Sequence, residues 1–324
     1  MDVLVVEPLD PQVLDWLSMR HSVVYAPHLA HDPREFRAAL RGVRALVLPP
    51  SVAVDRMVLR TAPQLLALGR LSGGAENLDL EACALAGVEV VRPAGASAAA
   101  EAEFAIGALL QLLRRVPVLN AEGLPVGREL GGAVVGIVGM TPAARPLARL
   151  LDAFGSRVLG YDPGLHSGDG IWERWGIEPV PLRQLVEHSD GLCVLLGYYS
   201  RYHGLLGQRY LASCKPNQVL VSLGPSSLFD EHALAQVLYR RRMAAAWFDS
   251  MEPGTLDPGR ALHGIDALQV TPRVASTTRE SRVRSAWAVA ERIDEILRLR
   301  DPAAGEFTTS PGELAGLEDD PAPV

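Results

Sequence analysis

The stretch GAVVGIVGMTPAARPLARLLDAFGSRVLGYDP, residues 132–163, decides the fold of this chain. An apolar run ends at Gly139, an amphipathic helical pattern continues to about Phe154, and a second apolar run ends at Asp162. This succession is typical of a βαβ unit in a parallel sheet. Such folds bind phosphate at the turn between strand and helix, because glycines without side chains let an anion approach the helix N-terminus. The stretch therefore predicts a Rossmann-type α/β fold with a dinucleotide site.

The turn itself departs from the glycine pattern of such sites. Gly139 keeps the first glycine position, Thr141 occupies the second and Ala144 the third, where alanine is tolerated because that position serves helix–strand packing. Thr141 places a branched side chain where phosphates approach, although its hydroxyl can bond one of them. Pro142 suits the first turn of a helix but lacks an N–H donor. Asp162, 23 positions after Gly139, stands where an acidic residue holds ribose hydroxyls and repels a 2′-phosphate, which favours NAD over NADP.

Short apolar runs alternate with helical patterns on both sides of this stretch. The predicted strands cover residues 3–8, 45–49, 65–69, 88–93, 132–139, 157–163, 191–197, 218–224, 244–248 and 267–272. Such alternation predicts parallel sheets, and 324 residues suit two domains. Long helical patterns at 98–116 and 278–299 predict connections between them. The last stretch, 301–324, holds six acidic and no basic residues among Pro and Gly, and is predicted to be a disordered tail.

Composition excludes several classes of function. The net charge is −7 and the 31 basic residues are scattered, which argues against nucleic-acid binding. No apolar run reaches the roughly 18 residues of a membrane helix, and the start lacks the basic region of a signal peptide, so we expect a cytoplasmic protein. Cys83, Cys193 and Cys214 lie in apolar stretches without metal-ligand spacing, which predicts buried free thiols and no metal site.

Several further motifs occur in a specific order. They are GRLSGGAENLDLEA at 69–82, ELGGAVVGIVG at 129–139, HSDGLCVLLGYYSRYHGLLG at 188–207 and LQVTPRVASTT at 268–278. With them the chain resembles the D-isomer-specific 2-hydroxyacid dehydrogenases up to about residue 300. Within that family it looks most similar to the C-terminal-binding protein branch, some plant members of which have lost catalytic residues.

The resemblance implies a domain organisation and a dimer. A flavodoxin-like, substrate-type domain would comprise residues 1–97 and 279–300, with the nucleotide-binding domain, 98–278, inserted between these two parts. A homodimer would form through the nucleotide-binding domains. NAD and a small anionic ligand would occupy the cleft between the two domains.

The catalytic residues of the family are replaced here. The family uses a histidine acid/base, an arginine that grips the substrate and a glutamate that orients the histidine. The resemblance aligns that histidine with Arg273 and that arginine with Pro225, while the glutamate falls at Glu252. A guanidinium does not exchange protons usefully near pH 7, and Pro225 leaves no carboxylate clamp. Arg273 is then either a cation for an anionic ligand, partnered by Glu252, or a structural arginine; Glu252 is either its partner or a surface residue.

Other positions of the cofactor cleft also depart from the family. Leu195 replaces a histidine and Ser222 an asparagine, and Gly197 and Ser222 complete the predicted cofactor contacts. The glycine loop of the first domain reads Ser72-Gly73-Gly74. Depending on the register, Trp247 replaces an aspartate near the nicotinamide, or a two-residue shift restores it as Asp249.

Aromatic and histidine side chains supply the remaining candidates. Tyr198, Tyr199 and Tyr202 occupy the loop that passes the cofactor in the family and either stack on a ligand or fill the cleft. His203 and His263 fall in loops that could border the cleft, whereas the other six histidines suit surface or cap positions.

These replacements favour a protein that binds or senses NAD(H), or another nucleotide, without ordinary hydride transfer. One alternative is an active oxidoreductase on a small 2-keto or 2-hydroxy acid, with Tyr198 or His263 as a relocated proton donor. Another is a purely structural dimer that binds a protein partner, tethered through its acidic tail.

Overall fold

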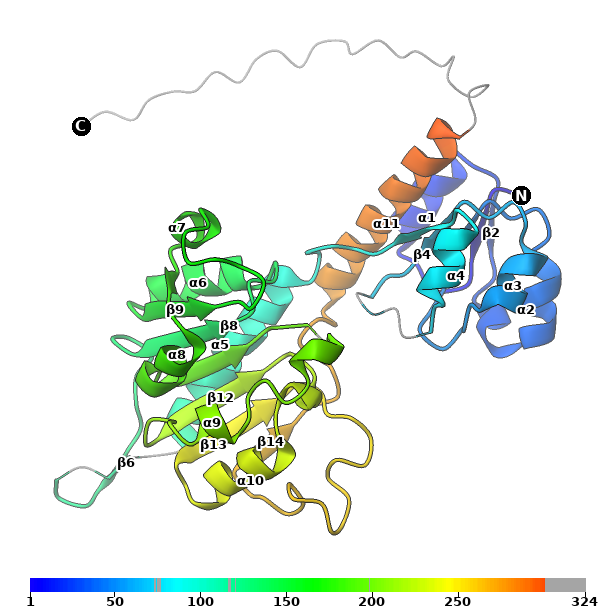
Figure 1. Cartoon of the computed structure of the whole chain (residues 1–324). Coiled ribbons are helices and arrows are strands. Elements are labelled where there is room, and N and C mark those ends of the chain that lie inside the picture. The colour runs from blue at the N-terminus through cyan, green and yellow to red at the C-terminus, as the bar shows by residue number, and fades with distance from the viewer. Residues whose placement is uncertain (73, 75–76, 116–117, 120, 198, 301–324) are drawn as a thin grey trace, which may run out of the picture. The chain divides into compact units, whose positions relative to one another are not determined.

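The computed structural model describes residues 1–300 except 73, 75–76, 116–117, 120 and 198 (Figure 1). The predicted tail, residues 301–324, lies outside this part of the chain. Two compact units divide the chain: unit 1 comprises Met1–Arg92 and the chain from Ala286 onward, and unit 2 comprises Pro93–Ser285. None of the helices in the described residues combines the length and apolarity that a bilayer crossing requires.

Unit 1 contains a parallel sheet in the order β2-β1-β3-β4-β5, the flavodoxin-like order. Its strands are β1 (Val3–Val5), β2 (Val23–Tyr25), β3 (Ala45–Val47), β4 (Ala67–Gly69) and β5 (Glu89–Val91). Its helical segments are α1 (Pro11–Ser18), η1 (Pro27–His31), α2 (Pro33–Ala39), α3 (Arg56–Thr61), α4 (Leu80–Leu85) and the part of α11 (Arg279–Leu299) that begins at Ala286. One sheet face packs on α2, α3 and α4, and the other on α1 and α11. Sequence analysis missed β2, an edge strand of three residues with mostly exposed side chains.

The long helix α11 is fastened to unit 1 by ring and ion-pair contacts as well as by its apolar face. Trp16 and Trp287 pack edge to face, with ring centroids 5.6 Å apart, where α11 lies beside α1 (Figure 1). The His21 Nε2 and Asp294 Oδ1 atoms lie 2.9 Å apart, and each side chain is only 11% exposed. His21 follows the C-terminal end of α1 and is a part-buried, hydrogen-bonded histidine, and its partner lies 273 positions away, so no local pattern indicates the pair.

Unit 2 contains a second parallel sheet of seven strands, in the order β10-β9-β8-β11-β12-β13-β14. Its strands are β8 (Val134–Val138), β9 (Arg157–Tyr161), β10 (Glu178–Pro179), β11 (Gly191–Val194), β12 (Gln218–Ser222), β13 (Met243–Phe248) and β14 (Leu268–Val270), and a hairpin pairs β6 (Val118–Leu119) with β7 (Pro125–Val126). The strand order reverses between β8 and β11, the position at which ligands bind in open α/β sheets. The predicted α/β fold with two parallel sheets is thus confirmed.

Helices cover both faces of the unit 2 sheet. They are α5 (Ala98–Arg115), α6 (Ala144–Ala153), α7 (Ile171–Trp175), α8 (Leu182–His188), η2 (Ser200–Tyr202), α9 (Gln208–Leu211), η3 (Ser226–Leu228) and α10 (Glu231–Tyr239). The helices α5, α6 and α7 pack on one face, and α8, α9 and α10 on the other. Strands buried on both sides read as continuous apolar runs, which is why the sequence predicted them well.

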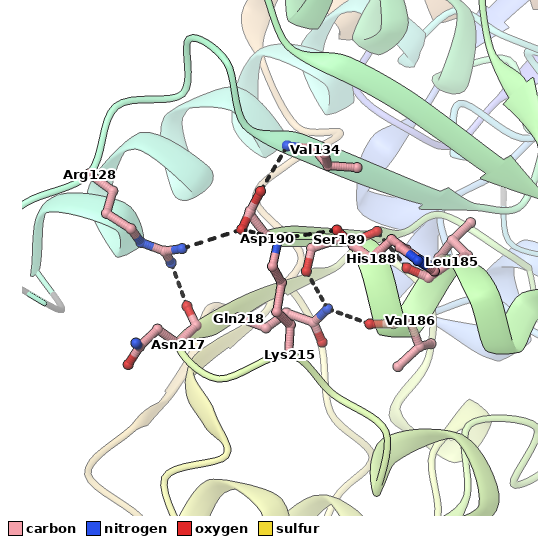
Figure 2. Close-up of polar contacts among 10 residues, drawn as sticks. All are labelled: Arg128, Val134, Leu185, Val186, His188, Ser189, Asp190, Lys215, Asn217 and Gln218. Carbon is pink, nitrogen blue, oxygen red and sulfur yellow. Dashed lines mark hydrogen bonds and ion pairs between the residues drawn. The ribbon is translucent and has the colours of Figure 1, made fainter.

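A polar network joins three strands at the amino edge of the unit 2 sheet (Figure 2). One oxygen of Asp190 accepts a hydrogen bond from Val134 N at 2.9 Å, and the other lies 2.8 Å from the Lys215 ammonium and 3.8 Å from the Arg128 guanidinium. Gln218, which is fully buried, donates to the carbonyl oxygens of Val186 and Ser189. Lys215, the only lysine of the chain, therefore neutralises a carboxylate that fixes the start of β8.

We expect Asp190→Ala to lower the free energy of unfolding by about 1–3 kcal/mol, because Val134 N and two cations lose their acceptor. The control is Glu187→Ala, which removes an exposed ion pair with Arg183 and should cost less than about 0.5 kcal/mol. Urea unfolding midpoints measure both effects. Equal shifts for the two variants would show that Asp190 does not anchor the strands.

The three cysteines are buried free thiols, as predicted. Burial raises the pKa of Cys193 and that of Cys214 to about 12, and burial followed by the charge of Asp79 raises the pKa of Cys83. We expect no reaction of the native protein with a thiol reagent at pH 8, and three labelled thiols after denaturation. Unfolded thiols ionise first as the pH rises, so stability should fall from about pH 9 upward. Rapid native labelling would contradict this burial.

Candidate functional site

The loops that follow the strands of unit 2 all emerge at the carboxyl edge of its sheet, because the strands are parallel. Gly139 follows β8, Asp162 follows β9 and Gly197 lies three residues after β11. The edge continues with Pro225 after β12 and Arg273 after β14. Neighbouring strands of a sheet are about 4.8 Å apart, so the predicted site residues of unit 2 lie along one continuous edge.

Gly139 is required where it stands. Its φ is +98°, and a Cβ atom there would lie 2.6 Å from both the backbone N and the Cα of Leu196. The glycine therefore lets the loop after β11 approach the turn after β8.

Asp162 holds the turn from the neighbouring strand. Its Oδ2 accepts a hydrogen bond from Met140 N at 2.7 Å, and its Oδ1 accepts one from Gly164 N at the same distance. Each carboxylate oxygen can accept a second hydrogen bond, so ribose hydroxyls can still be bound.

The turn retains features that suit a phosphate group. The Thr141 hydroxyl oxygen is buried and has no hydrogen-bond partner among the described residues, which is unusual for a buried polar atom. Helix α6 begins after Ala143 without a side-chain cap. Pro142 and Pro146, however, remove two N–H donors from this region, and Ala144 is fully buried in packing. These residues fit a dinucleotide with fewer backbone donors than an all-glycine turn offers.

The loop after β12 carries Pro225 at the position that the resemblance aligns with the substrate-binding arginine. Pro225 is the N-cap residue of the short helix η3, and the Ser222 hydroxyl is fully buried and donates to Gly224 O at 3.1 Å. A Cβ atom on Gly224 would lie 2.5 Å from Leu196 O, so this loop also touches the loop after β11. Gly197 has open space around it.

Asp249 organises the loop that carries Arg273. Its buried carboxylate accepts hydrogen bonds from the Thr271 hydroxyl at 2.8 Å and from the amides of Val274 and Ala275 at 2.9 Å. The N–H of Arg273 also donates to Asp249 O at 2.6 Å. Sequence analysis weighed Asp249 only as a residue near the nicotinamide and missed this anchoring role, because its partners lie 22 to 26 positions away.

Arg273 itself adopts a left-handed backbone, with φ +57°, which is uncommon for a residue with a side chain. Its Nε donates to the Ser250 hydroxyl at 3.0 Å. Trp247, the other residue weighed for the aspartate position, lies within β13, donates to the Thr271 hydroxyl and packs against Phe104. The loop after β14 is therefore strongly determined by its neighbours.

Glu252 is hydrogen-bonded to the serines of η3. Its carboxylate accepts a hydrogen bond from Ser227 N at 3.2 Å, and its own N–H donates to the Ser226 hydroxyl. Glu252, both serines and His203 line one cavity of about 350 Å³. The predicted pairing of Glu252 with Arg273 thus stays a prediction. His263 lines a separate cavity of about 950 Å³.

The aromatic loop after β11 divides into an exposed and a buried part. Tyr202 is buried in the core, whereas Tyr199 is 59% exposed, and Tyr198 lies outside the described residues. The Arg201 guanidinium lies over both described rings. Sequence analysis missed this arginine, although the order YYSRY places it between the two tyrosines.

Comparison with known proteins identifies the family. Residues 108–275, more than half of the chain, match the family model described as D-isomer specific 2-hydroxyacid dehydrogenase, NAD binding domain. The chain belongs to this family. Family membership agrees with the resemblance that its motifs indicated.

Similar proteins of this family cover nearly the whole chain. The (S)-sulfolactate dehydrogenase of Chromohalobacter salexigens is 30% identical over 308 residues, which is 92% of this chain and 99% of the relative. The D-3-phosphoglycerate dehydrogenase of Mycobacterium tuberculosis is 29% identical over 97% of this chain, which spans 59% of that longer protein.

Solved structures share the fold of this chain. The TT0316 protein from Thermus thermophilus shares 25% identity at a TM-score of 0.74, over 92% of this chain and 97% of that protein. A D-2-hydroxyisocaproate dehydrogenase, 19% identical, has the same fold at a TM-score of 0.76, over 93% of this chain and 98% of that chain.

The close contact at Gly139 gives a stability prediction for this member of the family. Gly139→Ala should lower the free energy of unfolding by about 1–3 kcal/mol more than Gly155→Ala. Both glycines have a positive φ, but a Cβ at Gly155 meets nothing within 4 Å. Gly155→Ala should therefore lose only the about 1–2 kcal/mol that a left-handed backbone costs a residue with a Cβ atom. Calorimetry on both variants tests this difference, which would be absent if the loop after β11 moved away freely.

Proposed function

We propose that this protein is a catalytically degenerate member of the D-2-hydroxyacid dehydrogenase family, close to the C-terminal-binding protein branch. It binds NAD(H), with reduced affinity, at the carboxyl edge of unit 2 and acts as a binding or sensing protein. Its working form is a homodimer, as the resemblance to the family implies.

Arg273, which the resemblance aligns with the acid/base histidine of the family, carries this proposal. Arg273 cannot give or take a proton near neutral pH, and its Nε bond to Ser250 occupies part of its hydrogen-bonding capacity. Pro225 offers no cation for a substrate carboxylate. Losing both residues removes the proton donor and the cation that holds the substrate carboxylate. One compensating residue would restore only one of these two functions.

The remaining residues still have roles in binding. When bound, a nicotinamide dinucleotide supplies or accepts a hydride. Asp162 would hold the ribose hydroxyls and Thr141 would donate to a phosphate oxygen, with Gly139 keeping the turn open. Gly197 and Ser222 border the rest of the cofactor. Arg273 would attract a small anionic ligand and orient it without exchanging protons.

A specific observation favours an active oxidoreductase as the second candidate. Glu252 and His203 line one cavity, so a carboxylate and an imidazole are available for proton transfer beside the Pro225 loop. Relatives such as the sulfolactate dehydrogenase are named for that activity. The third candidate, a dimer that only binds a protein partner, requires that the turn no longer binds a nucleotide.

Two measurements separate these candidates. We expect NADH fluorescence to report binding to the wild-type protein. NADH oxidation with glyoxylate, pyruvate or hydroxypyruvate should stay at the protein-free rate, because no proton donor stands at position 273. Substantial turnover that is abolished by Glu252→Gln or Arg273→Ala would contradict the proposal, and failure to bind NADH would favour the partner-binding dimer.

The binding site is tested with matched carboxylate variants. Asp162→Ala should weaken NADH binding about tenfold, the loss of roughly one charge-assisted hydrogen bond or more. Asp169→Ala is the control, because Asp169 also accepts a backbone hydrogen bond, from His166 N at 2.7 Å, in the same loop region. Equal NADH affinity of the two variants would show that Asp162 is not part of the binding site.

A further inference from the structure

A cavity lies between helix α10 and the chain that leads into the edge strand β14 (Figure 1). Its volume is about 950 Å³, within the range of pockets that bind small molecules. Residues 232, 235, 236 and 239 of α10 line it, a spacing that places them on one face of the helix. Residues 261 and 263–267 supply most of the remaining lining. The cavity is therefore a groove along one helix face, the α10 groove.

The α10 groove reaches the amino edge of the unit 2 sheet. Asn217, Arg241 and Asp266 line this end, and they lie one or two residues before β12, β13 and β14, respectively. Parallel strands all begin at one edge and end at the other. The end of the groove that these three residues form is therefore distinct from the carboxyl edge, where the dinucleotide is proposed to bind.

Two residues that line the groove have an uncommon backbone conformation. Three non-glycine residues of the described chain have a positive φ, and two of them are Asn217, at +64°, and Arg241, at +52°. Asparagine adopts a left-handed backbone fairly readily, whereas arginine does so at a cost. Costly conformations of this kind are concentrated at functional sites, because a role of the side chain can outweigh the loss of stability.

Arg241 occupies a position at which glycine is usually found. It follows the C-terminal end of α10, where the amides of Arg241 and Arg242 donate to the carbonyl oxygens of Leu238 and Val237, respectively. This pair of hydrogen bonds forms a Schellman motif, whose left-handed residue is most often glycine. Arginine at this position therefore lowers stability, while its side chain lines the groove.

The charges around Arg241 leave its guanidinium available to an anion. Arg240, Arg241 and Arg242 are consecutive and exposed, and of the three Arg241 lines the groove. Cations at this end of a helix suit its dipole, which accounts for the neighbouring arginines but not for the left-handed backbone of Arg241. Within the described residues, no carboxylate pairs with the Arg241 guanidinium, and Asp266 is the one acidic residue of the groove lining.

The groove also offers apolar surface. Leu238 is buried, and Ala235, Ala244 and Ile265 line the groove with half-buried side chains. The Tyr239 ring, 84% exposed at the end of α10, adds an uncovered aromatic face. Apolar lining with a few placed polar groups is the usual composition of a small-molecule site.

We propose that the α10 groove binds a small organic anion. A carboxylate or phosphate group of the ligand pairs with the Arg241 fork, and the Asn217 amide donates to the same group. The apolar body of the ligand lies against Leu238 and Ile265. This inference goes beyond the proposed function and does not rest on it, because none of these residues belongs to the dinucleotide site.

Calorimetric titration of the full-length protein with phenylacetate, phenyl phosphate and inorganic phosphate tests the groove. We expect the two aromatic anions to bind with dissociation constants of about 1 mM or below, and inorganic phosphate to bind at least about tenfold more weakly, because it lacks an apolar body. Tighter binding of phenyl phosphate identifies a phosphate as the preferred group, and tighter binding of phenylacetate identifies a carboxylate. Saturating NADH should leave both affinities unchanged.

Arg241→Gly should change binding and stability in opposite directions. Affinity for the aromatic anions should fall about tenfold or more, because the charge-assisted hydrogen bonds are lost. The unfolding temperature should rise by about 2–4 °C, since glycine adopts the left-handed backbone at lower cost. A merely structural arginine would not give a more stable protein with weaker anion binding.

Two further variants control for general electrostatics. Arg240→Ala removes a neighbouring exposed guanidinium that is not part of the groove lining, and affinity should stay within about twofold of wild type. Asp266→Asn removes a like charge from the lining and should strengthen anion binding severalfold.

The results separate this inference from the proposed function. Absence of binding by both aromatic anions, equal losses in Arg241→Gly and Arg240→Ala, or displacement of the anions by NADH would overturn the groove site. Robust NADH oxidation with a 2-keto acid would overturn the degenerate function, yet a selective loss of anion binding in Arg241→Gly would still support the groove.

Discussion

The parallel alignment of the unit 2 strands is the constraint on which the site depends. Each strand ends at the same edge, so residues as far apart in sequence as Gly139 and Arg273 lie along one edge of the sheet. Gly139 and Gly224 then let the loop after β11 pack closely on its neighbours on both sides. The edge is consequently one packed surface of loops.

Two carboxylates convert these loops into fixed structures. Asp162 binds the amides of Met140 and Gly164, and Asp249 binds the loop from Thr271 to Ala275. Hydrogen bonds from backbone N–H groups to a carboxylate are charge-assisted and therefore hold these loops strongly. The loops of this dehydrogenase-family fold are therefore held by backbone hydrogen bonds to two carboxylates. This support does not depend on the identity of residue 225 or 273, which the proposal treats as replaced.

The sequence predicted the fold better than it predicted the contacts of the site. Strands such as β8 and β12 are buried on both faces and read as apolar runs, so local pattern was sufficient. Edge strands such as β2 were missed because exposure removes that signal. Asp162 was found because its partner turn is nearby and its spacing is typical, whereas the role of Asp249 depends on hydrogen bonds to a distant loop. Predictions about Arg273 and Glu252 rested on alignment with the family, which gives position but not partners. In the structure Arg273 donates to Ser250, and Glu252 accepts from Ser227.

The residues along the carboxyl edge of unit 2 determine how the binding energy of a dinucleotide is distributed over its parts. In a glycine-rich turn, backbone N–H groups bind the phosphates and supply much of this energy. In this chain each of Pro142 and Pro146, at the start of α6, removes one N–H donor. Thr141 replaces at most one of them with a hydroxyl. Under the proposed function, part of the affinity then comes from groups other than the backbone, and Asp162 is such a group among the described residues near this edge. It would act on the adenosine end of a dinucleotide, while the resemblance aligns Pro225 and Arg273 with the end at which hydride transfer occurs. A protein arranged in this way would recognise the cofactor mainly by the part that does not react, which is the distribution expected of a sensor.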